Sequence, residues 1–258
     1  MKLIDSHCHL DFEQFSQDRE QVLQAAHQQG VTDMVLPGVQ SNRWDSLINL
    51  CQATAGLHYG LGLHPLFIDQ HQRQDIELLR TYLAQYTPCA VGEIGLDFYD
   101  RNLSIDKQIA VFEAQLAVAL EFDLPVILHV RKAHEDILNL LRKYPVQGGI
   151  VHAFNGSLNQ AQRYQAHGFK FGFGGMLTYP RSRRLRELAQ QLPLETIVLE
   201  TDSPDMTVQQ HKGTRNSPAY LSYCVQALAE LRQMSASQLA AITRQNTIDV
   251  LRLTVRTE

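Results

Sequence analysis

The chain has 258 residues, of which 44% are hydrophobic and 19% are charged, with 15 Gly and 9 Pro. This composition excludes a disordered chain, a collagen-like chain and a coiled coil. The formal net charge of -4, from 23 Lys and Arg against 27 Asp and Glu, gives no support to a strongly basic nucleic-acid-binding protein.

Short apolar runs alternate along the chain with longer stretches of helical periodicity. The first two runs cover residues 3–9 and 33–39, and later runs begin near residues 59, 90, 126, 149, 169 and 196. Amphipathic stretches include 18–29, 42–55, 105–122, 135–144 and 157–167. The pattern predicts about eight parallel strands, most of them followed by a helix.

Eight strand–helix units in 258 residues give about 32 residues per unit, the usual size in a (β/α)8 barrel. The main alternative is a doubly wound open sheet, which places its site at a switch point between two strands. Polar residues follow at least six of the runs, and a barrel gathers such strand ends on one face. We therefore predict an α/β fold, a TIM-type (β/α)8 barrel that forms a single domain over residues 1–258, with an additional helix at about 237–251 packed outside it.

The first residues lack the long apolar core of a secretory signal, and no apolar stretch approaches the roughly 20 residues that cross a bilayer. The cysteines are widely spaced and form no C-x-x-C pair, which favours buried, reduced thiols; they are Cys8, Cys51, Cys89 and Cys224. We expect a cytoplasmic protein with no membrane association and no obligate protein partner.

The first run ends in the sequence IDSHCH. Side chains alternate between the two faces of a strand, so His7 and His9 share one face and Cys8 points to the other. Imidazole commonly binds divalent metal ions, and this pair could form half of a metal site. Two half-buried, hydrogen-bonded histidines are an equally acceptable interpretation of so short a motif on its own.

Other runs end in similar side chains. Glu93 follows an apolar strand in VGEIGLD, where the flanking Gly92 and Gly95 indicate a backbone that something approaches closely. Together with two further histidines and one aspartate, these side chains offer enough nitrogen and oxygen donors for two divalent ions, which a carboxylate such as Glu93 can bridge. The complete candidate metal-binding set is His7, His9, Glu93, His129, His152 and Asp202.

The blocks DSHCH, LGLHP, GEIGLDF, HAFNGS and LETDSP, in this order, resemble the signature blocks of the TatD family of metal-dependent hydrolases. The resemblance runs at least from residue 4 to residue 204. It implies a barrel of the metal-dependent amidohydrolase kind, a divalent-metal centre and, for several family members, a deoxyribonuclease activity. The ligands that it implies are the same six residues.

These features predict a divalent-metal-dependent hydrolase that attacks a phosphodiester with a metal-activated water at a dinuclear site. We expect two ions of Mg, Mn or Zn, and DNA as the substrate of an exonuclease-like reaction. Asp202 is the candidate for orienting the water or accepting its proton, with pure ligation as its alternative role, and Glu93 is the second catalytic candidate. A small amide, lactone or phosphoester is the alternative substrate, and a non-catalytic metal-binding protein is a third interpretation.

Three further residues are candidates for substrate binding: His64, Arg131 and Glu200. Arg131 suits a phosphate group, whereas His64 and Glu200 could equally be structural or supporting residues. Four arginines follow the seventh run, and they could either track a nucleic-acid backbone or form a solvated helix face; they are Arg181, Arg183, Arg184 and Arg186.

Overall fold

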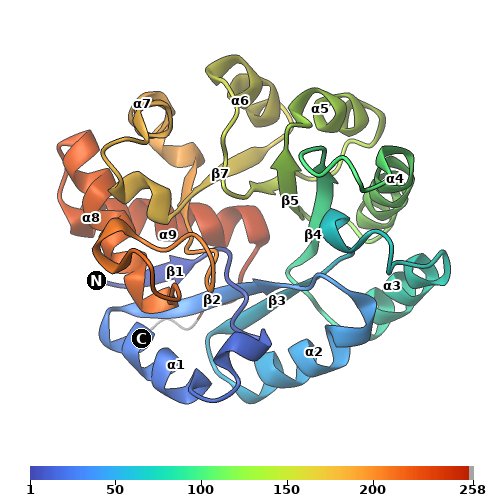
Figure 1. Ribbon diagram of the computed structural model, residues 1–258, viewed down its shortest axis with the longest axis horizontal. Coiled ribbons are helices and arrows are strands. Elements are labelled where there is room, and N and C mark those ends of the chain that lie inside the picture. Colours follow the sequence, from blue (N-terminus) through green and yellow to red (C-terminus); the bar gives the residue numbers. More distant parts are fainter. Residues whose placement is uncertain (256–258) are drawn as a thin grey trace.

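Eight strands lie side by side in the middle of the molecule, in the order β1 to β8, and each ladder between neighbours is parallel (Figure 1). The computed structural model describes residues 1–255. The strands are β1 (Leu3–Asp5), β2 (Val31–Pro37), β3 (Leu57–Leu61), β4 (Ala90–Asp97), β5 (Val126–Arg131), β6 (Gly149–Val151), β7 (Phe169–Phe173) and β8 (Ile197–Leu199).

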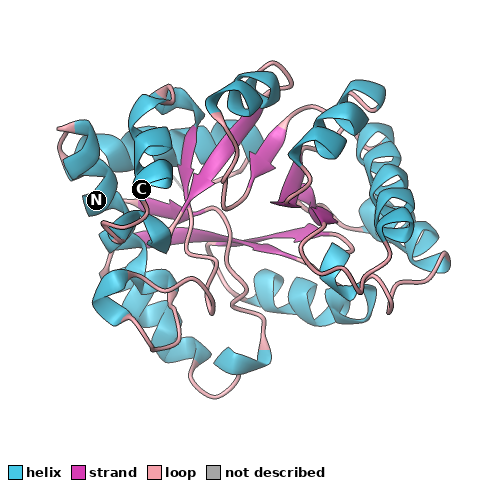
Figure 2. Cartoon of the chain, turned by 45° about the horizontal axis from the view of Figure 1, so that its top comes forward, coloured by secondary structure: helices cyan, strands magenta, loops and turns pink. Residues whose placement is uncertain are grey.

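A helix follows each strand and lies outside the barrel, as both ribbon views show (Figures 1 and 2). These helices are α1 (Arg19–Gln28), α2 (Trp44–Ala53), α3 (Gln74–Gln85), α4 (Ile105–Glu121), α5 (His134–Lys143), α6 (Leu158–Gln165), α7 (Arg183–Gln191) and α8 (Leu221–Arg232), and α9 (Ala236–Leu251) is the additional one. Short 3-10 helices occur at Glu13–Phe15, Ser41–Arg43, Pro65–Phe67, Gly175–Thr178, Leu194–Thr196, Gln209–His211 and Pro218–Tyr220. Within residues 1–255, no helix has the length and apolar character needed to span a membrane. The predicted (β/α)8 barrel is confirmed.

The additional helix α9 packs against β1, β6, β7 and β8. Its last residue, Leu251, and the following Leu253 join an apolar cluster with one side chain from each of six strands; those side chains are Ile4, Val35, Ala90, Ile127, Ile150 and Val198. A capping box at Ser235 starts the helix, because the Ser235 hydroxyl accepts a hydrogen bond from the backbone of Gln238. The predicted helix at 237–251 is therefore confirmed, and its end covers part of the barrel interior.

The first and last strands meet at a seam that loop residues close. Thr201 donates two hydrogen bonds to the buried Asp5 carboxylate, from its backbone N–H at 2.9 Å and its hydroxyl at 2.5 Å. The backbone N–H of Asp202 also donates to His7 O at 2.9 Å. The segments that follow β1 and β8 are thus held together where the barrel closes.

The predicted first strand is too long. β1 ends at Asp5, and His7 and His9 lie in the irregular segment after it. The backbone N–H of Cys8 donates to Val35 O at 3.0 Å, and that of His9 donates to Ser203 O at 2.8 Å. Because this segment bonds alternately to β2 and to the loop after β8, it leaves the regular ladder.

Close packing around β4 depends on two glycines. A Cβ atom at Gly95, whose φ is 147°, would lie 2.0 Å from His129 O in β5. A Cβ atom at Gly92 would lie 2.7 Å from the Cβ atom of Ile127, which is also in β5. The sequence predicts that something lies close to the backbone around Glu93, and the structure shows that this neighbour is β5.

We expect Gly95→Ala to lower the free energy of unfolding by about 3–5 kcal/mol, because the methyl group meets the β5 backbone in a conformation unfavourable for alanine. Gly213 provides a matched control, with φ at 89° and no atom within 4 Å of an added Cβ. Its replacement by alanine should cost only about 1–2 kcal/mol. Urea unfolding of both variants measures the difference, and equal losses would contradict the packing argument.

Candidate metal centre

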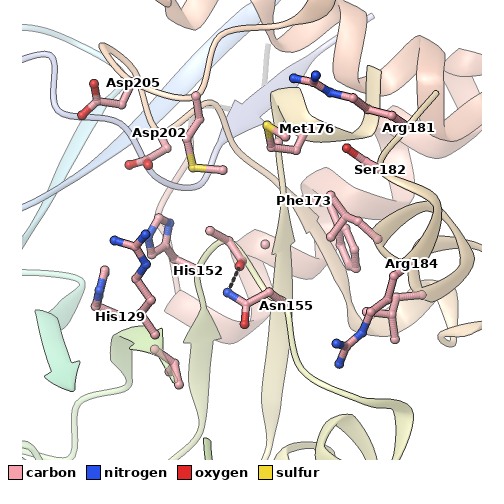
Figure 3. Close-up of a pocket in the computed structure, with 18 of the residues that line it drawn as sticks. His129, His152, Asn155, Phe173, Met176, Arg181, Ser182, Arg184, Asp202 and Asp205 are labelled. Carbon is pink, nitrogen blue, oxygen red and sulfur yellow. Dashed lines mark hydrogen bonds between the residues drawn. The ribbon is translucent and has the colours of Figure 1, made fainter. Parts of the chain in front are cut away.

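Strand ends from five parts of the barrel supply the six candidate metal-binding residues. His7 and His9 follow β1, Glu93 lies in β4, His129 lies in β5, His152 follows β6, and Asp202 follows β8. The structure brings all six together in one cluster, and Figure 3 shows three of them, His129, His152 and Asp202, on one side of a pocket. In a barrel of parallel strands, the carboxyl-terminal end is where side chains from distant segments converge.

Glu93 lies at the centre of this cluster, and its two carboxylate oxygens face different imidazoles. Oε2 is 3.3 Å from His7 Nε2 and 3.6 Å from His9 Nε2. Oε1 is 3.2 Å from His129 Nδ1 and 3.5 Å from His152 Nε2. The carboxylate therefore separates the histidines into two groups of nitrogen donors.

The first group has the spacing of a metal coordination shell. The Nε2 atoms of His7 and His9 are 3.2 Å apart, and Asp202 Oδ1 lies 3.6 Å from each of them. In a tetrahedral shell with metal–ligand distances of about 2.1 Å, neighbouring ligand atoms lie roughly 3.4 Å apart. These three side chains and Glu93 Oε2 could therefore hold a divalent cation without large movements.

In the second group, the His129 ring is oriented by a carboxylate behind it. Its Nε2 atom is 2.9 Å from Asp97 Oδ2, and Asp97 Oδ1 accepts a hydrogen bond from the backbone N–H of Tyr99 at 2.9 Å. Burial opposes ionisation of Asp97, but the hydrogen bonds from His129 and Tyr99 outweigh it and lower the pKa of Asp97 below its usual value. With the His129 proton held on Nε2, Nδ1 is left as the nitrogen that faces Glu93.

His64 contacts Glu93 as a hydrogen-bond donor. Its Nδ1 atom accepts from the backbone N–H of Leu66 at 3.1 Å, so the neutral ring carries its proton on Nε2, which lies 3.1 Å from Glu93 Oε1. His71 fixes the same segment by donating from Nε2 to His64 O at 2.8 Å. His64 is thus buried against the Glu93 carboxylate and contacts Oε1, the oxygen that also faces His129 and His152.

Glu200 lies buried beside His152. Its Oε1 atom accepts a hydrogen bond from the backbone N–H of Ala153 at 2.6 Å and is 3.4 Å from His152 Nδ1. The carboxylate fits only because residue 172 is glycine, since a Cβ atom there would lie 2.0 Å from Glu200 Oε2. Glu200 is therefore positioned to support His152 from the barrel interior.

The buried charges in the cluster stabilise one another. Burial raises the pKa of a carboxylate, but nearby His64, His7 and His152 outweigh this effect and hold the pKa of Glu93 well below its usual value. Conversely, burial lowers the pKa of His152, whereas Asp202, Glu93 and Glu200 raise it, and the net result is about 10. The buried carboxylates thus attract positive charge, which protonated imidazoles supply here and which a divalent cation can supply in their place.

A cavity of about 780 Å³ opens beside the cluster and is continuous with it. Its wall includes His129, His152 and Asp202, together with the candidate substrate residue Arg131. The guanidinium group of Arg131 lies 3.6 Å from the centroid of the exposed Tyr99 ring. The four arginines of the predicted cluster fall in the loop before α7 and in its first turns, and three of them line the cavity: Arg181, Arg183 and Arg184.

Several residues of the site were not singled out from the sequence. Asn155, Met176 and Asp205 line the cavity from loops and from a 3-10 helix that no periodic pattern marks. Asn155 does lie in the block HAFNGS, which could have drawn attention to it. Tyr99 carried no such signal, because its role depends on the position of Arg131 in the neighbouring strand end.

Known proteins resemble this chain over nearly its whole length. The family model described as TatD related DNase matches residues 4–252. The uncharacterized metal-dependent hydrolase YjjV of Escherichia coli is 37% identical over 249 residues, which cover 95% of this chain and 96% of YjjV. The 3'-5' ssDNA/RNA exonuclease TatD of Erwinia amylovora is 31% identical over 95% of this chain and 97% of its own length.

The fold agrees with these sequence relationships. The crystal structure of E. coli YjjV superposes with a TM-score of 0.93 at 36% sequence identity and covers 98% of both chains. The chain therefore belongs to the TatD family of metal-dependent hydrolases.

Proposed function

We propose that this protein hydrolyses phosphodiester bonds of DNA with a pair of divalent cations, as an exonuclease-like enzyme. The observation that carries the proposal is the position of Glu93, whose two oxygens face separate groups of nitrogen donors. A carboxylate in such a position can contact two cations at the separation of roughly 3.5–4 Å that two-metal hydrolases use.

Each proposed cation site combines two histidine nitrogens with one Glu93 oxygen, and the first site also has an Asp202 oxygen. The first site is formed by His7, His9, Asp202 and Glu93 Oε2, and the second by His129, His152 and Glu93 Oε1. Mixed nitrogen and oxygen donors of this kind can hold Mg, Mn or Zn. When bound, two divalent cations would lower the pKa of a water molecule and neutralise charge on the phosphoryl oxygens.

Asp202 is the proposed proton acceptor. It lines the cavity and also lies 3.6 Å from both His7 and His9, so its carboxylate reaches the substrate space and the first group at once. Its φ of 54° places this side chain in a left-handed turn held by the hydrogen bond to His7 O. Such conformations of non-glycine residues are concentrated at functional sites. One Asp202 oxygen can remain on the first group while the other receives the proton of the attacking water.

The remaining residues have supporting roles in this proposal. His64 donates to Glu93 and fixes the orientation of the central carboxylate, and Glu200 supports His152. Arg131 lies on the cavity wall two residues beyond His129, where its guanidinium can contact the phosphate group that is cleaved. The choice of DNA rests on the family model described as TatD related DNase and on the Erwinia relative named as an exonuclease.

The substrate proposal is tested with purified protein on single- and double-stranded DNA, RNA, a small phosphodiester and a panel of amides and lactones, each with Mg, Mn and Zn. We expect DNA cleavage that chelation abolishes. His7→Ala should reduce this cleavage at least about 100-fold, since even supporting residues of metal sites contribute 10–100-fold. Replacement of the exposed His27 on α1 by alanine is the matched control and should change nothing. Hydrolysis of an amide or lactone with DNA left intact would overturn the assignment.

The orientation of His129 is tested by Asp97→Asn. This variant keeps an oxygen acceptor but removes the charge behind the ring, so we expect metal affinity and cleavage rate to fall about 10–100-fold. Asp45→Asn is the control, because Asp45 is an exposed carboxylate that accepts a hydrogen bond from the Tyr82 hydroxyl on the outer helices. Competition with a chromogenic chelator measures the metal affinity. Equal affinities of the two variants would show that Asp97 does not act through His129.

A further inference from the structure

The cavity continues beyond the metal centre to the start of α7. Figure 3 shows His129, His152 and Asp202 on one side of it, and Arg181 and Arg184 on the opposite side. Its volume of about 780 Å³ lies within the range typical of ligand pockets and exceeds what a single phosphate group requires. The arginine side is therefore available to a part of the substrate that does not react.

The arginines at the start of α7 and in the loop before it divide into two kinds. Arg184 donates from Nη2 to Gly156 O at 3.0 Å, and Arg186 donates from Nη1 to Leu177 O at 2.5 Å. These two bonds fasten the start of α7 to neighbouring loops. Arg181 lies near the Tyr179 ring. Arg181 and Arg183 are exposed at the cavity wall, as Arg184 is, but within residues 1–255 their guanidinium groups form no hydrogen bond.

The charges of Arg181 and Arg183 are not balanced by neighbouring carboxylates. Several arginines elsewhere form ion pairs with acidic side chains: Arg43 with Asp11, Arg80 with Glu77 and Glu121, Arg163 with Glu135, Arg215 with Asp18, and Arg252 with Asp123. Among residues 1–255, Arg181 and Arg183 form no ion pair within 4.0 Å. Two cations this close in sequence repel each other, and an anion between them would relieve the repulsion.

The space between the arginines and the metal centre has an apolar wall. Met176, which Figure 3 places between the two sides, lines it together with Phe173 and Leu185. Met206 adds an exposed apolar side chain from the loop after β8. A sugar and base can lie against such a surface, whereas a phosphate cannot be stabilised there.

We propose that Arg181 and Arg183 form a second phosphate-binding subsite, which holds a phosphate group of the same nucleic-acid strand beyond the one that is cleaved. The nucleoside between the two phosphates lies over the apolar wall at Met176. Guanidinium groups fit phosphate through paired hydrogen bonds, and the guanidinium groups of Arg181 and Arg183 are free of ion pairs within residues 1–255. The inference rests on the proposed phosphodiesterase function and narrows its substrate to a chain with at least two phosphate groups.

The subsite is tested first by binding, without catalysis. Fluorescein-labelled oligothymidylate is titrated with metal-free protein in EDTA, and anisotropy is followed over a series of salt concentrations. We expect Arg181→Gln/Arg183→Gln to weaken binding about 10-fold at low salt. The slope of log Kd against log salt should fall by roughly 0.7, because the two arginines neutralise one phosphate and each neutralised phosphate of a single strand contributes about 0.7.

A matched control removes two arginines at the opposite end of the barrel. Arg142 lies in the last turn of α5, and Arg252 follows α9 and pairs with Asp123 beyond the end of α4. Arg142→Gln/Arg252→Gln changes the net charge equally, so it should leave the affinity and the salt slope unchanged. An equal loss in both double variants, or no loss in the Arg181/Arg183 variant, overturns the subsite.

Cleavage by the metal-loaded protein gives an independent readout. The Arg181→Gln/Arg183→Gln variant should raise KM for the oligonucleotide about 10-fold with little change in kcat, and it should cleave bis(p-nitrophenyl) phosphate like the unaltered protein. An equal defect on this small diester would contradict a remote subsite. If the oligonucleotide binds through the two arginines but is not cleaved with any metal, the phosphodiesterase proposal fails while the subsite stands.

Discussion

A single buried carboxylate, that of Glu93, determines much of how this barrel is built. Moving an ionised carboxylate out of water is unfavourable unless opposite charges or hydrogen-bond donors surround it. Here the surrounding groups are imidazoles from β5 and from the segments that follow β1, β3 and β6, which reach Glu93 across the end of the barrel. An open sheet could not bring side chains from so many strand ends around the two oxygens of one carboxylate. The closed barrel is thus a requirement of the site as well as its scaffold.

The same requirement explains the small residues and buried carboxylates nearby. Gly92 and Gly95 let β4 approach β5, so that Glu93 and His129 meet. Asp97 then forms a hydrogen bond to the His129 ring, and Glu200 lies 3.4 Å from the His152 ring, in each case on the side away from Glu93. Members of a charged cluster hold one another in place, and loss of one supporting carboxylate weakens its neighbours as well.

The sequence predicts the barrel and its metal-binding candidates because both follow from a pattern that repeats along the chain. Apolar runs ending in His, Glu or Asp indicate strand ends, and a parallel barrel places such ends together. His7 and His9 do lie together, as strand alternation predicts, but for another reason: β1 ends at Asp5, and the loop backbone aims both rings at Glu93. Contacts such as His64 on Glu93 could not be predicted, because they depend on the tautomer and on a loop hydrogen bond to Leu66. Similarly, four neighbouring arginines look equivalent in the sequence. Only the folded loops show that Arg184 and Arg186 bond to loop carbonyls, whereas Arg181 and Arg183 form no such bond within residues 1–255.

The proposed function requires that Glu93 hold one divalent cation on each of its oxygens. Crystals soaked with Mn and measured near the manganese absorption edge test it directly, because anomalous scattering locates each ion independently of the protein geometry. We expect two peaks that flank the Glu93 carboxylate, one beside His7 and His9 and one beside His129 and His152. A single peak, or ions bound away from Glu93, would contradict it.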